Sequence, residues 1–300
     1  MKQFIKNTII FVIPLCFVVL LVWIVDPLNY FGYNHIIPQA RKDSIFAEYA
    51  GNDLIKIGEK KKVNFRQYKD VNGWIIGDSR TTPIETDYIS SITNYSWYNM
   101  GIPGCYTRSA YSSFFWMINT ATKKPNIVYW GHNFWGANSY NYFLEIEDHG
   151  SSPLKYITSH LIWKLIGMEI NIPKETKNKI EDSEESWDEL FNRKQNQISH
   201  EHIHVQAEIY DLIDSISHYC KRQNIRLIHV YPPEYKNLLA IIQSDSITNA
   251  EYQKYLDHLS QYEFYNFNQG HWIESSNDFG DPMHPKAHVY NNMIDSIFGD

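Results

Sequence analysis

The chain has 300 residues, of which 43% are hydrophobic and 20% are charged, and its formal net charge is -7. This length and composition are typical of a globular protein with a sizeable core, and they exclude an intrinsically disordered or fibrous chain. The acidic balance also argues against a nucleic-acid partner, because such a partner requires a basic protein surface.

The N-terminal region carries a long apolar run. Residues 7–25, NTIIFVIPLCFVVLLVWIV, contain no charged side chain, and as a helix they would extend about 28 Å, close to the hydrocarbon thickness of a bilayer. We therefore predict a transmembrane helix over residues 7–27. Because Lys2 and Lys6 precede the run, the positive-inside rule places residues 1–6 in the cytoplasm. The rest of the chain is then expected on the periplasmic or extracellular side of a bacterial cytoplasmic membrane.

A cleaved signal peptide is the alternative interpretation of this run. Cleavage requires a shorter apolar core followed by small residues in an A-x-A-like pattern. After Val25 the chain reads DPLNYFGYNH, which offers no such site. An uncleaved anchor is therefore the favoured interpretation.

The cysteines add little about the compartment. Cys16 lies within the apolar run, so Cys105 and Cys220 are the only candidates for a disulfide in the body of the protein. A disulfide is permitted outside the cytoplasm, but the spacing does not show that the two residues meet. Two buried free thiols are the favoured alternative.

After the apolar run we predict a stalk over residues 28–70, with a short helix within 44–63. From residue 71 onward, short apolar runs alternate with segments of helical periodicity, which predicts one α/β domain over residues 71–300. The expected strands are 73–77, 95–101, 126–131, 225–231 and 264–268, and the expected helices are 108–122, 207–224, 248–262 and 285–298. Such alternation implies a parallel sheet covered by helices on both faces, with ligands bound beyond the carboxyl ends of the strands.

Residues 134–205 interrupt this alternation and are predicted to be an insertion over the sheet. Its acidic stretch, EDSEESWDEL at 181–190, is expected to be solvated, although a substrate lid is an alternative, since long loops near strand ends are often functional. Aromatic residues near 129–142 would either line a sugar-binding rim or pack beneath the insertion. The alternating histidines His200, His202 and His204 lack nearby cysteines or paired carboxylates at a recognisable spacing, so we predict no metal site.

Groups suited to acyl transfer stand at the predicted strand ends. Ser79 follows the strand in WIIGDSR, and Asp281 and His284 stand three positions apart in DFGDPMHPKAH after the last strand. A serine hydroxyl becomes nucleophilic when a histidine takes its proton, and an acid orients that histidine. Gly101 and Gly104 in NMGIPGC and Asn133 in GHNFWG are candidates to supply donors to the oxyanion of a tetrahedral intermediate.

The order Gly-Asp-Ser, Gly, Gly-x-Asn and Asp-x-x-His resembles the SGNH (GDSL-type) hydrolase superfamily over roughly residues 71–298. The resemblance implies a flavodoxin-like three-layer α/β/α fold with a five-stranded parallel sheet, and no cofactor or metal. It implies that Ser79 is the nucleophile, His284 the general base and Asp281 its orienting partner. The N–H of Ser79, the N–H of Gly104 and the side-chain amide of Asn133 would form the oxyanion hole.

Two further residues of these blocks are candidates for substrate binding. Arg80 follows the serine, where many members of the family carry a small or apolar residue; it would either bind an anionic substrate group or pair with a nearby carboxylate, and the second is slightly favoured. His132, inside the Gly-x-Asn block, is expected to pack or hydrogen-bond near the site. Asp78 is expected to hold the loop through backbone N–H groups, and His288 is the reserve candidate for the base.

An anchored, outward-facing domain of this kind is expected to act on an acylated cell-envelope glycan, as a serine esterase, deacetylase or O-acyltransferase. Anchoring places lipids equally close, so a lipase or lysophospholipase is the first alternative. The second is a non-catalytic component of an envelope assembly that retains the fold. The location and the resemblance carry this expectation, since no residue is identified that recognises a sugar.

Overall fold

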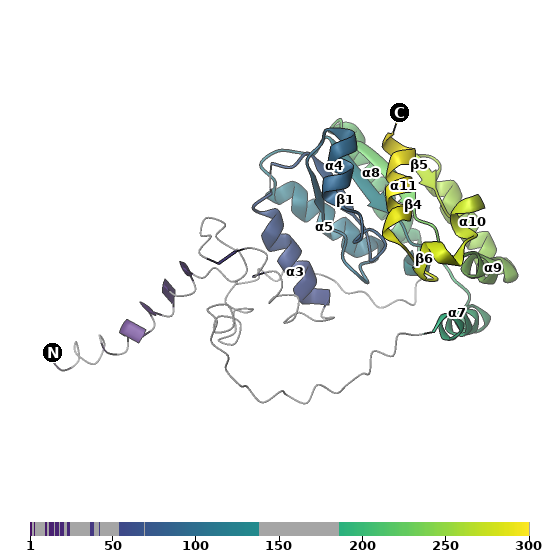
Figure 1. Cartoon of the computed structure of the whole chain (residues 1–300), viewed down its shortest axis with the longest axis horizontal. Coiled ribbons are helices and arrows are strands. Elements are labelled where there is room, and N and C mark those ends of the chain that lie inside the picture. Colours follow the sequence, from purple (N-terminus) through teal and green to yellow (C-terminus); the bar gives the residue numbers. More distant parts are fainter. Residues whose placement is uncertain are drawn as a thin grey trace. The chain divides into compact units, whose positions relative to one another are not determined.

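The computed structural model describes residues 70–137 and 186–299 without interruption, residues 54–68, and scattered positions before residue 54. The chain divides into two compact units, one formed by Met1–Gln67 with Glu147–Lys179 and the other by Tyr68–Ile146 with Ile180–Asp300. In the first unit, α3 spans Leu54–Phe65 and overlaps the end of the helix expected within 44–63. The sheet and every other helix described below belong to the second unit (Figure 1).

The predicted transmembrane segment, residues 7–27, lies largely outside the described residues. Among the positions that the structure does describe, no helix has both the length and the apolar character needed to cross a bilayer. The membrane anchor and the topology of the chain stay predictions.

The second unit contains a five-stranded sheet in which every neighbouring pair is parallel, in the order β2-β1-β3-β4-β5. Its strands are β1 (Gly73–Ile76), β2 (Trp97–Asn99), β3 (Ile127–Gly131), β4 (Arg226–Tyr231) and β5 (Phe264–Asn266). This confirms the predicted five-stranded parallel sheet, and the strand order is that of flavodoxin-like folds. The chain reverses its direction of winding between β1 and β3, which is where such sheets open a crevice for ligands.

The strands form where the sequence is apolar without alternation, because both faces of the sheet are covered. All the residues of β1 and β3 are buried. On one face, Ile75, Tyr129 and Val230 share a core with Met293 and its neighbours from the C-terminal helix. On the other face, the indole of Trp74 meets the ring of Phe114 edge-on at 6.2 Å.

Helices complete the two outer layers. They are α4 (Thr86–Thr93), α5 (Thr107–Thr120), α7 (Trp187–Glu201), α8 (Ala207–Arg222), α9 (Lys236–Ser244), α10 (Ser246–Leu259) and α11 (Ala287–Phe298). α4 and α11 pack together on one face of the sheet, and α5 and α8 pack together on the other. The helices expected at 108–122, 207–224, 248–262 and 285–298 are confirmed, with ends shifted by at most three residues.

Three helices were not predicted. α4 has only eight residues and no side-chain cap, and α9 follows a pair of prolines in the sequence, so neither carries a strong local signal. α7 does carry one, because Ser186 and Glu189 form a reciprocal capping box at its start. That pattern could have been recognised in the acidic run.

The predicted insertion at 134–205 is described only at its two ends, since residues 138–185 lie outside the described part. Its first end is a short 3-10 helix, Trp135–Ala137. Its second end is α7, whose Lys194 ammonium lies 4.3 Å from the centre of the Trp135 indole and whose Trp187 ring lies 5.1 Å from Tyr235. The described ends therefore pack beside the carboxyl ends of β3 and β4. Whether the segment between them covers the substrate stays a prediction.

Gly77, directly after β1, has a backbone conformation and a packing that exclude a side chain. Its φ is +146°, and a Cβ there would lie 2.6 Å from Thr81 Cγ2 and 3.0 Å from the Gly131 oxygen. We expect Gly77→Ala to lower the free energy of unfolding by about 3 kcal/mol, because strain and overpacking add. Urea denaturation followed by circular dichroism measures this loss.

Gly270→Ala is the matched control for that substitution. Gly270 also has a positive φ, +58°, but nothing lies within 4 Å of the added Cβ. Only the strain of the left-handed backbone conformation applies, so we expect the free energy of unfolding to fall by about 1 kcal/mol. Equal losses in the two variants would contradict the packing argument for Gly77.

Candidate active site

The nucleophile candidate stands on a tight turn at the carboxyl end of β1. After Gly77, the Asp78 carbonyl accepts hydrogen bonds from the backbone N–H of Thr81 at 3.1 Å and from its hydroxyl at 2.8 Å. The Asp78 side chain accepts the N–H of Arg80 at 3.0 Å, as expected from the sequence. These bonds hold Ser79 half-buried at the top of the sheet.

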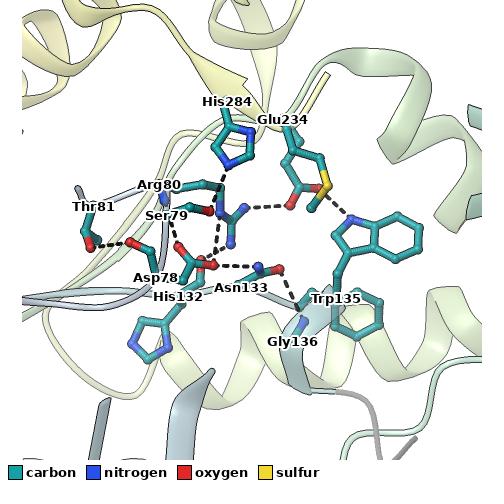
Figure 2. Close-up of polar contacts among 12 residues, drawn as sticks. Asp78, Ser79, Arg80, Thr81, His132, Asn133, Trp135, Gly136, Glu234 and His284 are labelled. Atoms are coloured by element: carbon teal, nitrogen blue, oxygen red, sulfur yellow. Dashed lines mark hydrogen bonds and ion pairs between the residues drawn. The ribbon is translucent and has the colours of Figure 1, made fainter. Parts of the chain in front are cut away.

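Ser79, His284 and Asp281 form one hydrogen-bonded chain. Ser79 Oγ lies 2.8 Å from His284 Nε2, although the two residues are 205 positions apart. His284 Nδ1 lies 2.7 Å from Asp281 Oδ2. Figure 2 shows the hydroxyl of Ser79 facing the imidazole of His284. The structure therefore brings together the three residues that the sequence proposed as nucleophile, base and orienting acid.

A short antiparallel pair that was not predicted fixes the base and the acid. β6 (Phe279–Asp281) pairs with β7 (His284–Pro285), so Asp281 and His284 lie opposite one another at the tip of this hairpin. Asp281 Oδ1 also accepts the backbone N–H groups of Met283 at 2.8 Å and His284 at 3.1 Å. The hairpin thus orients both oxygens of the carboxylate before any substrate binds.

The environment of Asp281 favours its ionised form. Partial burial opposes ionisation, but the hydrogen bond and the charge of His284, together with the two backbone N–H groups, outweigh it and lower the pKa of Asp281. At neutral pH the group beside His284 Nδ1 is therefore a carboxylate. It can hold the imidazole with Nδ1 protonated, which leaves Nε2 free to accept the proton of Ser79.

Asn133 is oriented by two hydrogen bonds. Its amide nitrogen donates to Asp78 Oδ2 at 2.6 Å, and its amide oxygen accepts the N–H of Gly136 at 3.3 Å. These bonds define which end of the amide is the nitrogen and link the end of β3 to the nucleophile turn. The second amide hydrogen of Asn133 meets no acceptor among the described residues.

The other two predicted oxyanion donors are also without an internal acceptor. In the described part of the chain, neither the N–H of Ser79 nor that of Gly104 donates to a protein group. Gly104 follows β2 in a turn and has a φ of +68°. Asn99, at the end of β2, joins this region to the nucleophile turn by donating to the carbonyl of Thr81 at 2.8 Å. The three donors thus follow three neighbouring strands, β2, β1 and β3.

Arg80 is buried, with 1% of its surface exposed, and its charge is paired inside the protein. Its guanidinium donates to Glu234 Oε1 at 2.6 Å and to the carbonyl of His132 at 2.5 Å. This placement matches the carboxylate-pairing alternative. It corrects the proposal that Arg80 contacts substrate, because a guanidinium that is buried and bonded on two sides offers no surface to an anionic group.

His132 is also buried, at 2% exposure, and Figure 2 shows its ring on the far side of Asp78 and Asn133 from His284. Its Nε2 lies 2.8 Å from His229 Nδ1, and its Nδ1 lies 3.1 Å from the hydroxyl of Tyr255. His229 Nε2 in turn lies 3.1 Å from Ser217 Oγ. The candidate substrate contact by His132 is therefore corrected as well: its ring belongs to an internal hydrogen-bond chain.

The two buried histidines are neutral in the folded protein. Burial, together with the neighbouring His229 and Arg80, lowers the pKa of His132 well below its usual range, and burial lowers the pKa of His229 to about 3. Because Ser217 donates to the carbonyl of Ile213 at 2.7 Å, its oxygen accepts from His229 Nε2. With Nε2 protonated on both histidines, every hydrogen bond in the series from Ser217 through His229 and His132 to Tyr255 has one donor and one acceptor.

The two buried, neutral histidines make the stability of the protein sensitive to acid. An unfolded histidine takes up its proton near pH 6.5, whereas His229 in the folded protein does so only near pH 3. The unfolded state thus binds more protons between these values, and each buried histidine lowers the free energy of unfolding by up to about 1.4 kcal/mol per pH unit as the pH falls. Urea denaturation from pH 7.5 to 4.5 measures the slope, which we expect to become shallower in His229→Gln.

The control for acid sensitivity is His218→Gln, since His218 is exposed on the same helix as Ser217. This variant is expected to keep the slope of the parent protein. An unchanged slope in His229→Gln would show that the buried ring does not cause the acid sensitivity.

The remaining histidine candidates are placed apart from Ser79. His288 Nε2 lies 3.0 Å from Asp278 Oδ1 on the exposed side of the hairpin. Of the predicted alternating set, His200 lies in α7, and His202 ends that helix and pairs with Asp245 at 3.1 Å. Within the described ranges, no group of three or more His, Cys, Asp or Glu side chains is arranged to hold a metal ion. Cys105 and Cys220 are both buried and form no disulfide.

Comparison with known proteins gives matches to solved structures alone. No family model and no curated protein matches the chain. A GDSL-like lipase from Bacteroides thetaiotaomicron shares 13% identity over 75% of this chain and 84% of its own, with a TM-score of 0.39. A lipolytic protein of the G-D-S-L family from Desulfitobacterium hafniense shares 10% over 75% and 96%, with a TM-score of 0.40. With TM-scores of this size, the similarity does not by itself carry a function to this chain.

Proposed function

We propose that this chain is a serine ester hydrolase of the SGNH type, which transfers an acyl group through an ester on Ser79. The observation that carries the proposal is the hydrogen-bonded series Ser79–His284–Asp281 at the carboxyl edge of the sheet. It is supported by three donors, the N–H groups of Ser79 and Gly104 and the side-chain amide of Asn133, which follow three neighbouring strands and have a hydrogen without an acceptor in the described part of the chain. The four sequence blocks that resemble the SGNH superfamily supply these same groups.

In the proposed reaction, Ser79 Oγ attacks the ester carbonyl while His284 Nε2 takes the hydroxyl proton. The carbonyl oxygen becomes an oxyanion that accepts from the N–H groups of Ser79 and Gly104 and from the free amide hydrogen of Asn133. Collapse of the intermediate breaks the bond to the alcohol, which leaves with the proton from His284. A hydroxyl of the acceptor then attacks the ester on Ser79, with His284 again as the base. The same steps in reverse order release the acyl product and restore the hydroxyl of Ser79. Asp281 keeps its negative charge and stabilises the imidazolium.

Water as the acceptor makes the protein an esterase or deacetylase, and a sugar hydroxyl makes it an O-acyltransferase. A glycan is the favoured substrate because the predicted anchor places the domain at the cell envelope.

Two other functions remain alternatives to the glycan esterase. A lipase or lysophospholipase would need a contiguous apolar wall, for which the sequence suggested residues 134–170, and most of these lie outside the described part. A non-catalytic envelope component would keep the fold without needing a bonded serine and histidine. The 2.8 Å contact between Ser79 and His284 therefore favours an enzyme.

The deciding experiment treats the full-length chain with a fluorophosphonate probe, which labels an activated serine. Labelling of the wild-type protein that is lost in Ser79→Ala is expected, and a folded wild type that does not react would refute the enzyme. Turnover of p-nitrophenyl acetate, butyrate and octanoate then separates the substrate classes. A preference for acetate favours a deacetylase or acetyltransferase, whereas a rate that rises with chain length favours a lipase. Adding a soluble oligosaccharide tests for transfer of the acyl group.

A further inference from the structure

Glu234 lies in the loop between β4 and α9, outside all four sequence blocks, yet it is completely buried beside the nucleophile turn. A buried carboxylate needs partners, because transfer of an unpaired charge from water to a protein interior is strongly unfavourable. Glu234 has such partners on both of its oxygens. Two of them, Arg80 and Trp135, follow β1 and β3 as Ser79 and Asn133 do, and the third is the hydroxyl of Tyr231 at the end of β4, which donates to Oε1 at 3.4 Å.

The contacts of Glu234 enclose the Asn133 segment from two sides. Glu234 Oε2 accepts the indole N–H of Trp135 at 3.0 Å, two residues beyond Asn133. Glu234 Oε1 accepts Arg80 Nη1 at 2.6 Å, and Arg80 Nη2 donates to the carbonyl of His132 at 2.5 Å, one residue before Asn133. Figure 2 shows this arrangement, with Arg80 between Glu234 and the His132 carbonyl.

Arg80 also carries the connection back to the nucleophile. The backbone N–H of Arg80 donates to Asp78 Oδ1, and Asp78 Oδ2 accepts a hydrogen bond from the side-chain amide nitrogen of Asn133. Glu234 is itself anchored from the next strand end, because its backbone N–H donates to Asn268 Oδ1 at 2.9 Å. The Arg80–Glu234 pair thus joins four strand ends, and two of them supply the attacking oxygen and an oxyanion donor.

We propose that Glu234 is a positioning residue of the catalytic site, acting through Arg80 and Trp135 to hold Asn133 in place relative to Ser79. The proposal rests on the proposed function. Without the carboxylate, Arg80 and Trp135 lose their shared acceptor, and the 132–135 segment is free to shift against the nucleophile turn. A displacement of about 1 Å in a catalytic group costs on the order of a hundredfold in rate. The effect falls on the reaction step, because Glu234 itself does not face the substrate.

The test compares Glu234→Gln with Glu263→Gln in the full-length chain. Glutamine keeps the size of Glu234 but replaces one acceptor oxygen with a donor that faces Arg80 or Trp135. Glu263 forms the matched control pair with Arg226 on the surface, where the two side chains are 35% and 47% exposed. Turnover of p-nitrophenyl acetate is measured per active serine, which titration with a fluorophosphonate counts. Circular dichroism and thermal unfolding report the fold.

We expect Glu234→Gln to lower kcat per active serine at least tenfold while KM stays within about twofold, and Glu263→Gln to change neither. Arg80→Lys provides a second variant, since a lysine keeps the charge opposite Glu234 but cannot bond both Glu234 and the His132 carbonyl. It is expected to lower kcat in the same way. A purely structural role predicts fewer active molecules but an unchanged kcat per active serine.

An unchanged kcat per active serine in either folded variant would overturn the proposal while leaving the proposed function in place. A wild-type protein that reacts with neither the probe nor the ester would instead refute the proposed function, and with it the role of Glu234. The two failures are therefore distinguishable in one set of measurements.

Discussion

Ser79→Ala and His284→Ala are each expected to abolish nearly all turnover of p-nitrophenyl acetate, with a loss in kcat of about a thousandfold or more. Ser79 Oγ and His284 Nε2 lie 2.8 Å apart, so the hydroxyl can pass its proton directly to the imidazole as it attacks. Without the hydroxyl there is no acyl-enzyme, and without the imidazole the hydroxyl is a weak nucleophile. Because the two residues act as a unit, removing either one already removes the contribution of both to kcat. The double variant should therefore be no slower than either single variant.

Matched substitutions separate this effect from damage to the fold. Ser91→Ala removes an exposed serine from α4, where its hydroxyl binds the Tyr88 carbonyl, and His218→Ala removes an exposed histidine from α8. Both variants are expected to keep the wild-type kcat, and all four should give the same far-ultraviolet circular dichroism. Turnover in Ser79→Ala or His284→Ala equal to that of the controls would refute the assignment of nucleophile and base.

Asn133→Ala is expected to lower kcat by about a hundred- to a thousandfold, the effect of removing one oxyanion donor. Asp78 and Gly136 hold the Asn133 amide so that one hydrogen stays without a partner in the described part of the chain. A donor aligned with the developing oxyanion stabilises the transition state more than the bound ester, so KM should change little. Stopped-flow or steady-state turnover of p-nitrophenyl acetate gives both constants.

A second substitution at this position checks that the donor matters and not the packing. Asn133→Asp keeps the shape of the side chain but removes both amide hydrogens and places a carboxylate against Asp78. We expect it to lower kcat at least as much as Asn133→Ala, whereas Asn292→Ala, an exposed asparagine of α11, should have no effect on this small ester. Wild-type kcat in Asn133→Asp would exclude the amide from the oxyanion hole.

The parallel sheet was predictable from the sequence because its signals are local. The β1 and β3 segments, GWII and IVYWG, are apolar without alternation, and a glycine follows the first and ends the second, a pattern typical of strands that are buried on both faces. α8 was predictable for a similar reason, since Ile209, Ile213 and Ile216 repeat at helical spacing. The residues that would attack, accept a proton and bind an oxyanion were identified because each block follows a predicted strand and the four blocks together resemble those of the SGNH hydrolases.

The partners of the charged and polar groups were not predictable in this way. Arg80 was correctly suspected of pairing with a carboxylate, but nothing in the sequence indicated Glu234, which lies 154 positions away. The hydrogen bond between His132 and His229 was missed for the same reason, since His132 follows β3 and His229 lies within the neighbouring strand β4, 97 positions away.

The sequence by itself thus determined the five strands of the sheet, four of the helices beside it and the chemical groups that follow the strands, because hydrophobic periodicity and short motifs act over a few neighbouring residues. The tertiary structure alone decided which of those groups lie together at the edge of the sheet and which are used internally. An unpaired buried charge is strongly unfavourable, so Arg80 and Glu234 pair with each other, and the buried, neutral ring of His132 hydrogen-bonds to His229 and Tyr255. Ser79, His284 and Asn133 lie at the edge of the sheet, where the proposed reaction requires a hydroxyl, a base and a donor to the oxyanion.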